Sequence, residues 1–295
     1  MKDGMRLRLL AAWPACLLAL ALATAALLTR ADARLIHQRE TPYGELYVTE
    51  DAAGRRTLRF RPEGARQSVV DLRDPGYLEL AYTRMALAGL ALAPAPRRVL
   101  FAGLGGGSLP RFAHRHFPEA MLEVVEINPH VLEVARQYLG FQADARLAVH
   151  IDDARAFIAR APPGSYDVIL LDAFADKVVP PHLATAQFLA AVRRALAPGG
   201  VVIANLWNRA NNERYDDMLA TYRAAFETVA TLAVASDVNV IVLALPRDEP
   251  IEREALAMRA RALASERRFR FDLAGMVRSG YFTEPAGRGL VLRDP

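Results

Sequence analysis

The segment VLFAGLGGGSLPR, residues 99–111, decides which fold this sequence can adopt. Four hydrophobic residues stand directly before a cluster of glycines, and residues that can begin a helix follow it. The glycines carry no side chains, so a ligand can lie against the backbone at the N-terminus of that helix, where free N–H groups attract polar groups. The segment therefore predicts a strand, a ligand-binding loop and a helix, in that order.

Short apolar runs rich in β-branched residues continue beyond this segment. Together with the first strand, they are RRVLFAG, LEVVEIN, RLAVHI, YDVILLDAF and GGVVIANLW. Segments with helical spacing, such as residues 129–139 and 185–196, separate them. Buried strands that alternate with amphipathic helices form a parallel sheet with helices on both faces. We therefore expect a Rossmann-like α/β fold with a mostly parallel, doubly wound sheet.

The chain on either side of these runs has other patterns. Residues 43–70 alternate apolar and polar positions around a glycine-containing turn, which predicts a small antiparallel sheet. Residues 77–92 have helical spacing, VNVIVLAL near the C-terminus predicts another strand, and residues 251–264 predict another helix. We accordingly divide the chain into an N-terminal β-sheet region, residues 34–76, and a Rossmann-like domain, residues 77–295.

The N-terminal residues 1–33 are predicted to be a signal peptide or a membrane anchor. Residues 9–28 are apolar and uncharged, basic residues precede them, and a small-residue pattern suited to cleavage follows. This predicts export to the periplasm, or anchoring to the inner membrane if the segment is not cleaved. Arginines after the segment balance the positive charges before it, so the positive-inside rule sets no orientation. The single cysteine, Cys16, lies within it, which excludes disulfides and cysteine chemistry from the rest of the chain.

Composition indicates a globular protein without a nucleic-acid partner. The 295 residues are 53% hydrophobic, enough for a substantial core. The formal net charge is +4, and half of it comes from the first 33 residues. Almost all cationic side chains are arginines, and they form no run or stripe of the kind that binds phosphate backbones.

Four strand ends are candidates for chemistry, because ligands of open parallel sheets bind at the carboxyl ends of the strands. The first end carries the loop glycines Gly103, Gly105, Gly106 and Gly107. Glu126 closes the next strand at the distance from which an acid reaches ribose hydroxyls. Asp153 follows the third strand, and Asp172 closes the fourth, where a carboxylate must be solvated, paired or used. Together these positions predict a nucleoside-binding site.

Other roles compete with the nucleoside site at two of these positions. Asp153 is also suited to capping the helix that begins there, and Glu126 to a role in a turn. The glycine spacing fits a dinucleotide fingerprint poorly, and NAD needs no acid after the third strand. A ligand with one nucleoside and no pyrophosphate would use Glu126 for the ribose and Asp153 for the adenine edge. This favours S-adenosylmethionine or a relative.

The sequence resembles the spermidine synthase family, and especially its bacterial spermidine synthase-like branch. The members of this family are the aminopropyltransferases of polyamine biosynthesis, built on the class I methyltransferase fold. The marks of the resemblance are GLGGGSLPRF, VVEINPHVLEVAR, DDARAFI, YDVILLDAF and LAPGGVVIANLW, within residues 43–207. The resemblance implies that Gln67, Tyr82, the loop glycines, Glu126 and Asp153 hold decarboxylated S-adenosylmethionine. It implies that Asp172 is the general base that deprotonates a small amine acceptor. It also implies a homodimer, by analogy alone.

The sequence departs from the family pattern at several positions. Gly106 stands where the family loop has an aspartate, Arg84 where it has a glutamate, and Asp172 and Asp176 are four residues apart instead of three. Fewer acids and an added arginine weaken polyamine recognition. Two alternatives therefore stay open: a methyltransferase that uses S-adenosylmethionine on an unknown acceptor, and a nucleoside-binding envelope protein without turnover.

Four further side chains are considered as functional residues: His114, His116, His182 and Trp207. His114 and His116 are two apart on a predicted helix and so face different sides, which argues against a metal site, and we expect no metal. His182 is either a surface histidine in a turn or a residue bordering the acceptor channel. Trp207, at the end of the fifth strand, either lines the pocket or packs in the core.

Overall fold

The computed structural model describes residues 33–295 except 94, 175–177, 236–237, 284–286 and 288. The signal or anchor predicted at residues 9–28 lies outside the described residues, and so does Asp176. Among the helices of the described part, none combines the length and apolar character needed to cross a membrane.

The N-terminal sheet is an antiparallel meander. Its strands are β1 (Arg34–Thr41), β2 (Gly44–Glu50), β3 (Arg55–Arg59) and β4 (Arg66–Asp71), paired in that order. The first turn is followed by Gly44, the first residue of β2, and the second contains Gly54; both glycines have positive φ, the conformation that tight hairpin turns require. Leu46 and Val48 are buried on one face of β2. The predicted small antiparallel sheet is confirmed.

The central sheet has the expected mostly parallel arrangement. Its strands are β5 (Arg98–Ala102), β6 (Met121–Glu126), β7 (Leu147–Ile151), β8 (Tyr166–Leu171), β9 (Leu196–Trp207), β10 (Thr228–Ala233), β11 (Asn239–Leu245) and β12 (Tyr281–Phe282). Their order across the sheet is β12-β10-β11-β9-β8-β5-β6-β7. The run from β9 to β7 is parallel, while β11, β10 and β12 pair antiparallel. The Rossmann-like fold of class I methyltransferases is confirmed.

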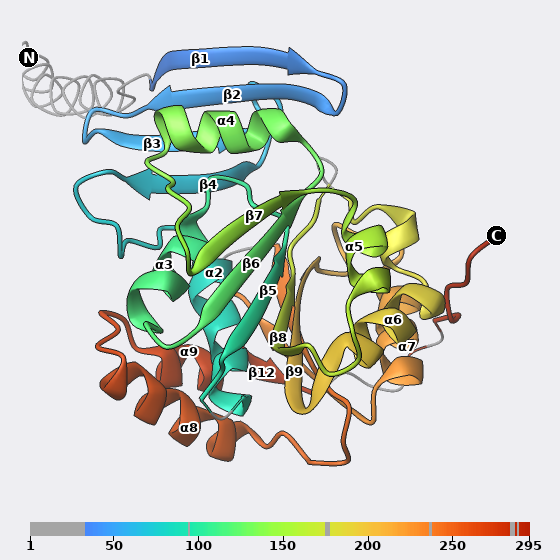
Figure 1. The fold of residues 1–295 in the computed structure, drawn as a ribbon. Helices are drawn as coiled ribbons and strands as arrows, with labels where there is room; N and C mark the ends of the chain where they lie inside the picture. The colour runs from blue at the N-terminus through green and yellow to red at the C-terminus, as the bar shows by residue number, and fades with distance from the viewer. Residues whose placement is uncertain (1–32, 94, 175–177, 236–237, 284–286, 288) are drawn as a thin grey trace, which may run out of the picture.

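Helices cover both faces of the central sheet (Figure 1). On one side lie α2 (Ala81–Ala86), the 3₁₀ helix η1 (Leu87–Leu92), α3 (Ser108–His116), α8 (Arg253–Glu266) and α9 (Leu273–Gly280); on the other lie α5 (Ala154–Arg160), η2 (Pro181–Leu183), α6 (Ala186–Ala195) and α7 (Tyr215–Ala225). Val99 and Phe101 of β5 enter the first core, and Leu100 and Ala102 enter the second. A strand buried on both faces has apolar residues at successive positions, which is why β5 has no polar alternation.

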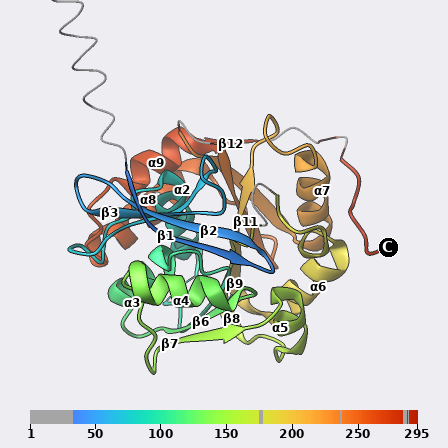
Figure 2. The same ribbon diagram turned by 90° about the horizontal axis from the view of Figure 1, so that it is seen from above.

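The N-terminal sheet lies over the carboxyl edge of the central sheet, next to α4 (Pro129–Tyr138) (Figures 1 and 2). Tyr138 of α4 stacks on His37 of β1 with ring centroids 4.5 Å apart, and Arg56 of β3 donates to the Tyr138 carbonyl oxygen at 2.7 Å. The sheet therefore closes over the strand ends where the ligand site was expected.

The helix predicted over residues 77–92 is only partly present. It begins at Ala81, and from Leu87 it tightens into η1. Gly89 explains the tight packing, because a Cβ there would lie 2.3 Å from a side-chain carbon of Ile203 on β9. The prediction was wrong for residues 77–80, where polar contacts hold the chain in another conformation.

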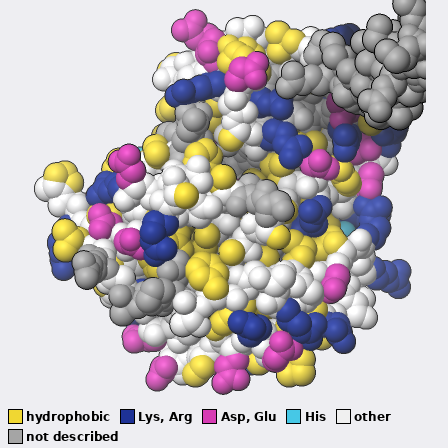
Figure 3. All heavy atoms as spheres, turned by 180° about the vertical axis from the view of Figure 1, so that it is seen from behind, with side chains coloured by type: hydrophobic (Ala, Val, Ile, Leu, Met, Phe, Trp, Pro, Cys, Tyr) yellow, Lys and Arg dark blue, Asp and Glu magenta, His cyan; other side chains and the backbone are white. Residues whose placement is uncertain are grey.

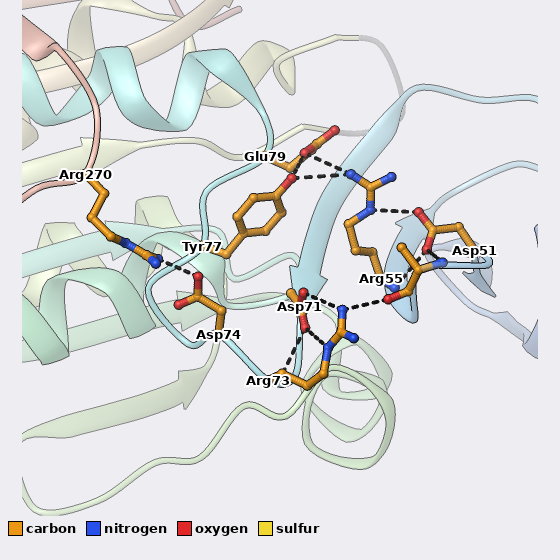
Figure 4. Close-up of polar contacts among 9 residues, drawn as sticks. Asp51, Arg55, Asp71, Arg73, Asp74, Tyr77, Glu79 and Arg270 are labelled. Carbon is orange, nitrogen blue, oxygen red and sulfur yellow. Dashed lines mark hydrogen bonds and ion pairs between the residues drawn. The ribbon is translucent and has the colours of Figure 1, made fainter.

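Those contacts form a polar network between β3, the end of β4 and the segment before α2 (Figure 4). Its members are Asp51, Arg55, Asp71, Arg73, Tyr77 and Glu79, and next to them Asp74 pairs with Arg270 from the segment before α9. The Arg55 guanidinium pairs with Asp51 at 2.7 Å and with Glu79 at 3.5 Å, and the Tyr77 hydroxyl donates to Glu79. Tyr77 and Glu79 are thereby held towards the N-terminal sheet, and the helix starts after them.

Charged side chains of both signs are interleaved on the face of the molecule opposite to Figure 1, with apolar side chains between them (Figure 3). The absence of a nucleic-acid partner, which we expected from composition, stays a prediction.

Candidate active site

A cavity of about 440 Å³ lies between the N-terminal sheet and the carboxyl ends of the central strands. The N-terminal sheet contributes Leu46, Gln67 and Ser68 to its wall, and strand ends and loops contribute much of the rest. The volume falls within the range of pockets for small ligands. Of the nine predicted site residues, the cavity wall includes Gln67, Tyr82, Gly103, Gly105, Glu126, Asp153 and Asp172.

Gly103 and Gly105 form the floor of the cavity. Gly103 has a φ of +104°, and a Cβ there would lie 2.3 Å from the carbonyl oxygen of Asp172. This position therefore requires glycine, because the backbone that carries Asp172 passes directly against it. Gly105, with a φ of +52°, keeps the loop backbone exposed to the cavity.

Gly106 and Gly107 are not among the described residues of the cavity wall. The Gly106 N–H donates to Ser68 Oγ at 2.8 Å, and a Cβ at Gly106 would lie 2.7 Å from Ser68 Cβ. Gly107 precedes α3 with a φ of +75°, and a Cβ there would lie 2.3 Å from the ring of Phe141. These two glycines allow close packing around the loop, so their direct contact with a ligand is not supported by the geometry.

Glu126, at the end of β6, is buried beneath the glycine loop. Its Oε2 accepts from Leu104 N–H at 3.0 Å, and its Oε1 accepts from Asn128 N–H at 2.9 Å. Burial raises the pKa of Glu126, and the backbone N–H groups oppose that rise. The carboxylate thus fixes the loop through backbone N–H groups, and it also lines the cavity.

Asp153 both caps a helix and lines the cavity, so the two interpretations of this residue are compatible. As the N-cap of α5 it accepts from Ala156 N–H at 2.9 Å, and its Oδ2 lies 2.8 Å from Nε2 of His182. Partial burial acts to raise the pKa of Asp153, but the hydrogen bonds from Ala156 and His182 outweigh it and leave the pKa below its usual value. Asp153 is therefore an ionised acceptor at neutral pH.

Asp172 follows β8 and is held by two donors. Its Oδ1 accepts from Nδ2 of Asn205 at 2.8 Å, and its Oδ2 accepts from the Tyr82 hydroxyl at 3.2 Å. Asn239 donates in turn to Oδ1 of Asn205 at 2.7 Å, which orients the Asn205 amide towards Asp172. Removal from water raises the pKa of Asp172 to about 6, although both donors act to lower it. A carboxylate with this pKa can accept a proton near neutral pH.

A second cavity of about 220 Å³ adjoins Asp172. Gln67, Tyr82, Asp172 and Phe174 line both cavities, so Asp172 stands where the two meet. Trp207 also lines the second cavity, so of its two interpretations the one as a residue of a cavity wall applies. Its ring packs against that of Phe174, with the ring centroids 6.1 Å apart. The two cavities offer separate spaces on either side of one carboxylate.

Sequence reasoning missed three polar residues of the site: Ser68, Asn205 and Asn239. Ser68 accepts from the loop backbone, Asn205 donates to Asp172, and Asn239 orients Asn205. His182, which the sequence placed either in a surface turn or beside an acceptor channel, contacts Asp153. Asn205 lies inside the apolar run VVIANLW, and a buried amide within such a run was the available signal. The roles of the others depend on contacts between distant segments, which no local pattern encodes.

Arg84 has a different position from the one its departure from the family pattern suggested. Its guanidinium donates to the Leu78 carbonyl oxygen at 2.7 Å, and it is absent from the described walls of both cavities. Arg84 therefore supports the segment before α2.

The two histidines of α3 have separate partners. Nε2 of His114 lies 2.9 Å from Asp144, and Nδ1 of His116 lies 2.7 Å from the Arg267 carbonyl oxygen. Across the described residues, no three carboxylate, histidine or cysteine side chains are grouped so that they could hold a metal ion.

The fold and the site together define a transferase of the class I methyltransferase-like fold. Residues 79–236 match the spermine/spermidine synthase domain, and the chain belongs to the spermine/spermidine synthase family.

Known relatives support this assignment. The polyamine aminopropyltransferase of Vibrio vulnificus is 35% identical over 236 residues, which is 78% of each chain. A probable spermidine synthase from Corynebacterium glutamicum shares the fold, with a TM-score of 0.71 and 23% identity over 88% of this chain and 96% of that one. Human methyltransferase-like protein 13, solved in complex with SAH, is 35% identical, with a TM-score of 0.59 over 64% of this chain and 93% of that one.

Proposed function

We propose that this protein transfers an aminopropyl group from decarboxylated S-adenosylmethionine to a small amine, with Asp172 as the general base. One observation carries the proposal: Asp172 stands between two cavities, with a pKa raised to about 6 and its oxygens oriented by Tyr82 and Asn205. The similarity to polyamine aminopropyltransferases supports it.

In this proposal the larger cavity binds the donor. Glu126 accepts the ribose hydroxyls, Asp153 accepts the amino group of adenine, and Gln67 and Tyr82 lie next to the sulfonium centre. The backbone at Gly103 and Gly105 leaves room for the nucleoside. No metal ion takes part in the proposed reaction.

The second cavity admits the acceptor amine beside Asp172. A protonated amine has no lone pair for attack, so Asp172 first accepts its proton. The neutral nitrogen then attacks the aminopropyl carbon that is bonded to sulfur. A C–N bond forms, the bond between that carbon and sulfur breaks, and its electron pair stays on sulfur. The products are the alkylated amine and methylthioadenosine. The contribution of the protein is the alignment of the two reactants and the acceptance of the proton.

The test is an assay of the purified protein with decarboxylated S-adenosylmethionine and putrescine, in which methylthioadenosine and spermidine are measured. Asp172→Asn should bind methylthioadenosine like the wild type but turn over roughly 10²- to 10⁴-fold more slowly, the usual contribution of a general base. Turnover unaffected by Asp172→Asn would refute its role. Binding of the nucleoside without turnover on any amine would favour a nucleoside-binding protein without catalysis.

Methyl transfer from S-adenosylmethionine is a second candidate, favoured by Ser68, which lines the larger cavity. Ser68 fills the space beside Gly106, where the family pattern has an aspartate for the aminopropyl ammonium. A neutral hydroxyl at this place would not repel the carboxylate of S-adenosylmethionine. The similarity to a methyltransferase-like protein solved with SAH agrees with this candidate. Calorimetric titration with both donors separates the two, since a preference for the carboxylated donor favours methyl transfer.

A further inference from the structure

His182, in the segment after β8, contacts the carboxylate that is proposed to recognise the base. It lies in η2, and both His182 and Asp153 line the larger cavity. An ionised carboxylate only accepts hydrogen bonds, so the proton between the two groups must be on Nε2 of His182, which donates to Oδ2 over 2.8 Å. The two side chains remain 45% and 32% exposed, so the pair lies at the cavity wall where a ligand can reach it.

A second contact fixes His182 independently of its ring. Arg155, two residues after Asp153, donates to the His182 carbonyl oxygen at 2.9 Å. The same guanidinium pairs with Asp294 near the C-terminus. The backbone of η2 is thus tied to α5 by Arg155, while the imidazole is left to act on Asp153.

Asp153 is therefore oriented by backbone N–H groups at the start of α5 and by the His182 side chain. The Ala156 N–H occupies one acceptor position of Oδ1, and His182 occupies one of Oδ2. Each carboxylate oxygen has a second acceptor position. With these donors fixing its plane, the carboxylate presents a remaining position to the cavity in a defined direction.

We infer that His182 is a positioning residue for base recognition: it holds Asp153 so that a carboxylate oxygen accepts the exocyclic amino group of a 6-aminopurine and rejects a 6-oxopurine. The inference rests on the proposed function, which supplies an adenosyl donor. A 6-oxopurine presents an acceptor at that place, so it would leave the carboxylate opposed by another oxygen. A site built around such a hydrogen bond discriminates strongly against a ligand that cannot make it.

The test uses calorimetric titration of the full chain with 5′-methylthioadenosine and 5′-methylthioinosine, which differ at the C6 position of the base. Three variants are compared: His182→Ala, His182→Gln and His182→Asn. The amide nitrogen of glutamine lies as many bonds from Cβ as Nε2 of histidine, so glutamine can replace histidine as the donor. The asparagine side chain is shorter, and its amide nitrogen cannot reach the same place. All three keep the backbone carbonyl that Arg155 binds.

We expect His182→Ala and His182→Asn to bind methylthioadenosine roughly tenfold more weakly, the usual effect of one lost hydrogen bond. Methylthioinosine binding should be unchanged, so that selectivity for adenine falls by the same factor. His182→Gln should retain most of the affinity for methylthioadenosine and most of the selectivity for adenine. In the transferase assay, the KM for the donor should rise while kcat stays constant, because the base lies away from the reacting carbon.

Two results would overturn the inference alone: wild-type affinity for methylthioadenosine in His182→Ala, or an equal loss for both nucleosides, which would show a merely structural role. Failure of the wild type to bind methylthioadenosine would instead overturn the proposed function, and the inference with it. Thermal unfolding of each variant checks that the fold is intact.

Discussion

Asp172 should control the pH dependence of turnover. The base must be ionised to accept a proton, and the pKa of Asp172 in the folded protein is about 6. We therefore expect kcat/KM to rise with pH through a pKa of about 6 and to lose this ascending limb in Asp172→Asn. A pH–rate profile between pH 5 and about 9 measures it. An ascending limb that persists unchanged in the variant would assign the titration to another group.

The same carboxylate should lower the stability of the folded protein above pH 6. Its pKa rises from 3.8 in water to about 6 on folding, so the folded state binds the proton more tightly than the unfolded state. Stability contributed by the protonated form is present below pH 3.8 and is lost as the pH rises to about 6. Asp172→Asn should thus be more stable than the wild type at pH 8 by roughly 1 to 3 kcal/mol, with no difference near pH 3.5. Urea unfolding at the two pH values tests this, and equal stabilities at pH 8 would contradict it.

Gly103 offers a test of close backbone approach, with Gly44 as its matched control. Both have a φ above +100°, but a Cβ at Gly44 meets nothing within 4 Å, whereas one at Gly103 meets the Asp172 carbonyl oxygen at 2.3 Å. Gly44→Ala should cost about 1 kcal/mol of backbone strain, and Gly103→Ala at least about 3 kcal/mol together with loss of turnover. Chemical denaturation of both variants gives the comparison. Similar losses would mean that the conformation alone, without the steric contact, selects glycine at position 103.

At the scale of single residues, the sequence predicted most of the residues that line the cavity but not the surroundings of each glycine. Glu126, Asp153 and Asp172 were predicted because the carboxyl ends of parallel strands share one edge, and seven of the nine predicted site residues line one cavity. Gly106 and Gly107 were grouped with the other glycines although Ser68 and Phe141 lie against them. Sequence spacing shows that a residue is glycine but not whether a ligand or a side chain fills the space.

At the scale of elements, strands β5 to β9 and β11 of the central sheet and the helices α4 and α6 were predictable, whereas β10 and β12 were not predicted. Asn128 and Thr185 accept from backbone N–H groups at the starts of α4 and α6. The start of α2 was not predictable, since Leu80 provides no capping side chain and Tyr77 and Glu79 are held by Arg55 of the N-terminal sheet. The periodicity of apolar residues predicts a helix, but it contains no information about a contact from another element that competes with helix formation.

Asn128 should be the most sensitive cap, because it joins two elements. Its Oδ1 accepts from His130 N–H at 3.0 Å, and its Nδ2 donates to Oγ1 of Thr41 on β1 at 3.1 Å. Asn128→Ala should lose roughly 1 to 2 kcal/mol from the cap and a further fraction from the contact with β1. Asn128→Asp keeps the cap acceptor but not the donor, so it should lose less in thermal or urea unfolding. An equally large loss for Asp would mean that the contact with Thr41 outweighs the cap.

At the scale of the molecule, the site depends on how two sheets meet, and this the sequence did not predict. Each sheet has its own local pattern, but nothing local says that β2 and β4 lie over the carboxyl ends of the central strands. The larger cavity takes Leu46, Gln67 and Ser68 from the N-terminal sheet and Glu126, Asp153 and Asp172 from the strand ends and the loops after them. A nucleoside bound there, as proposed, would contact both sheets at once.

Ligand binding should therefore protect both sheets together. A ligand that binds only the folded state stabilises it by about 2.7 kcal/mol at 100 times its Kd. With saturating methylthioadenosine we expect slower amide hydrogen exchange in residues 44–50 and 66–71 of the N-terminal sheet as well as in the glycine loop, residues 103–107. Exchange measured by mass spectrometry with and without the nucleoside tests this, and α8, which does not line the cavity, serves as an internal reference. Protection confined to the glycine loop would mean that the N-terminal sheet covers the site without holding the ligand.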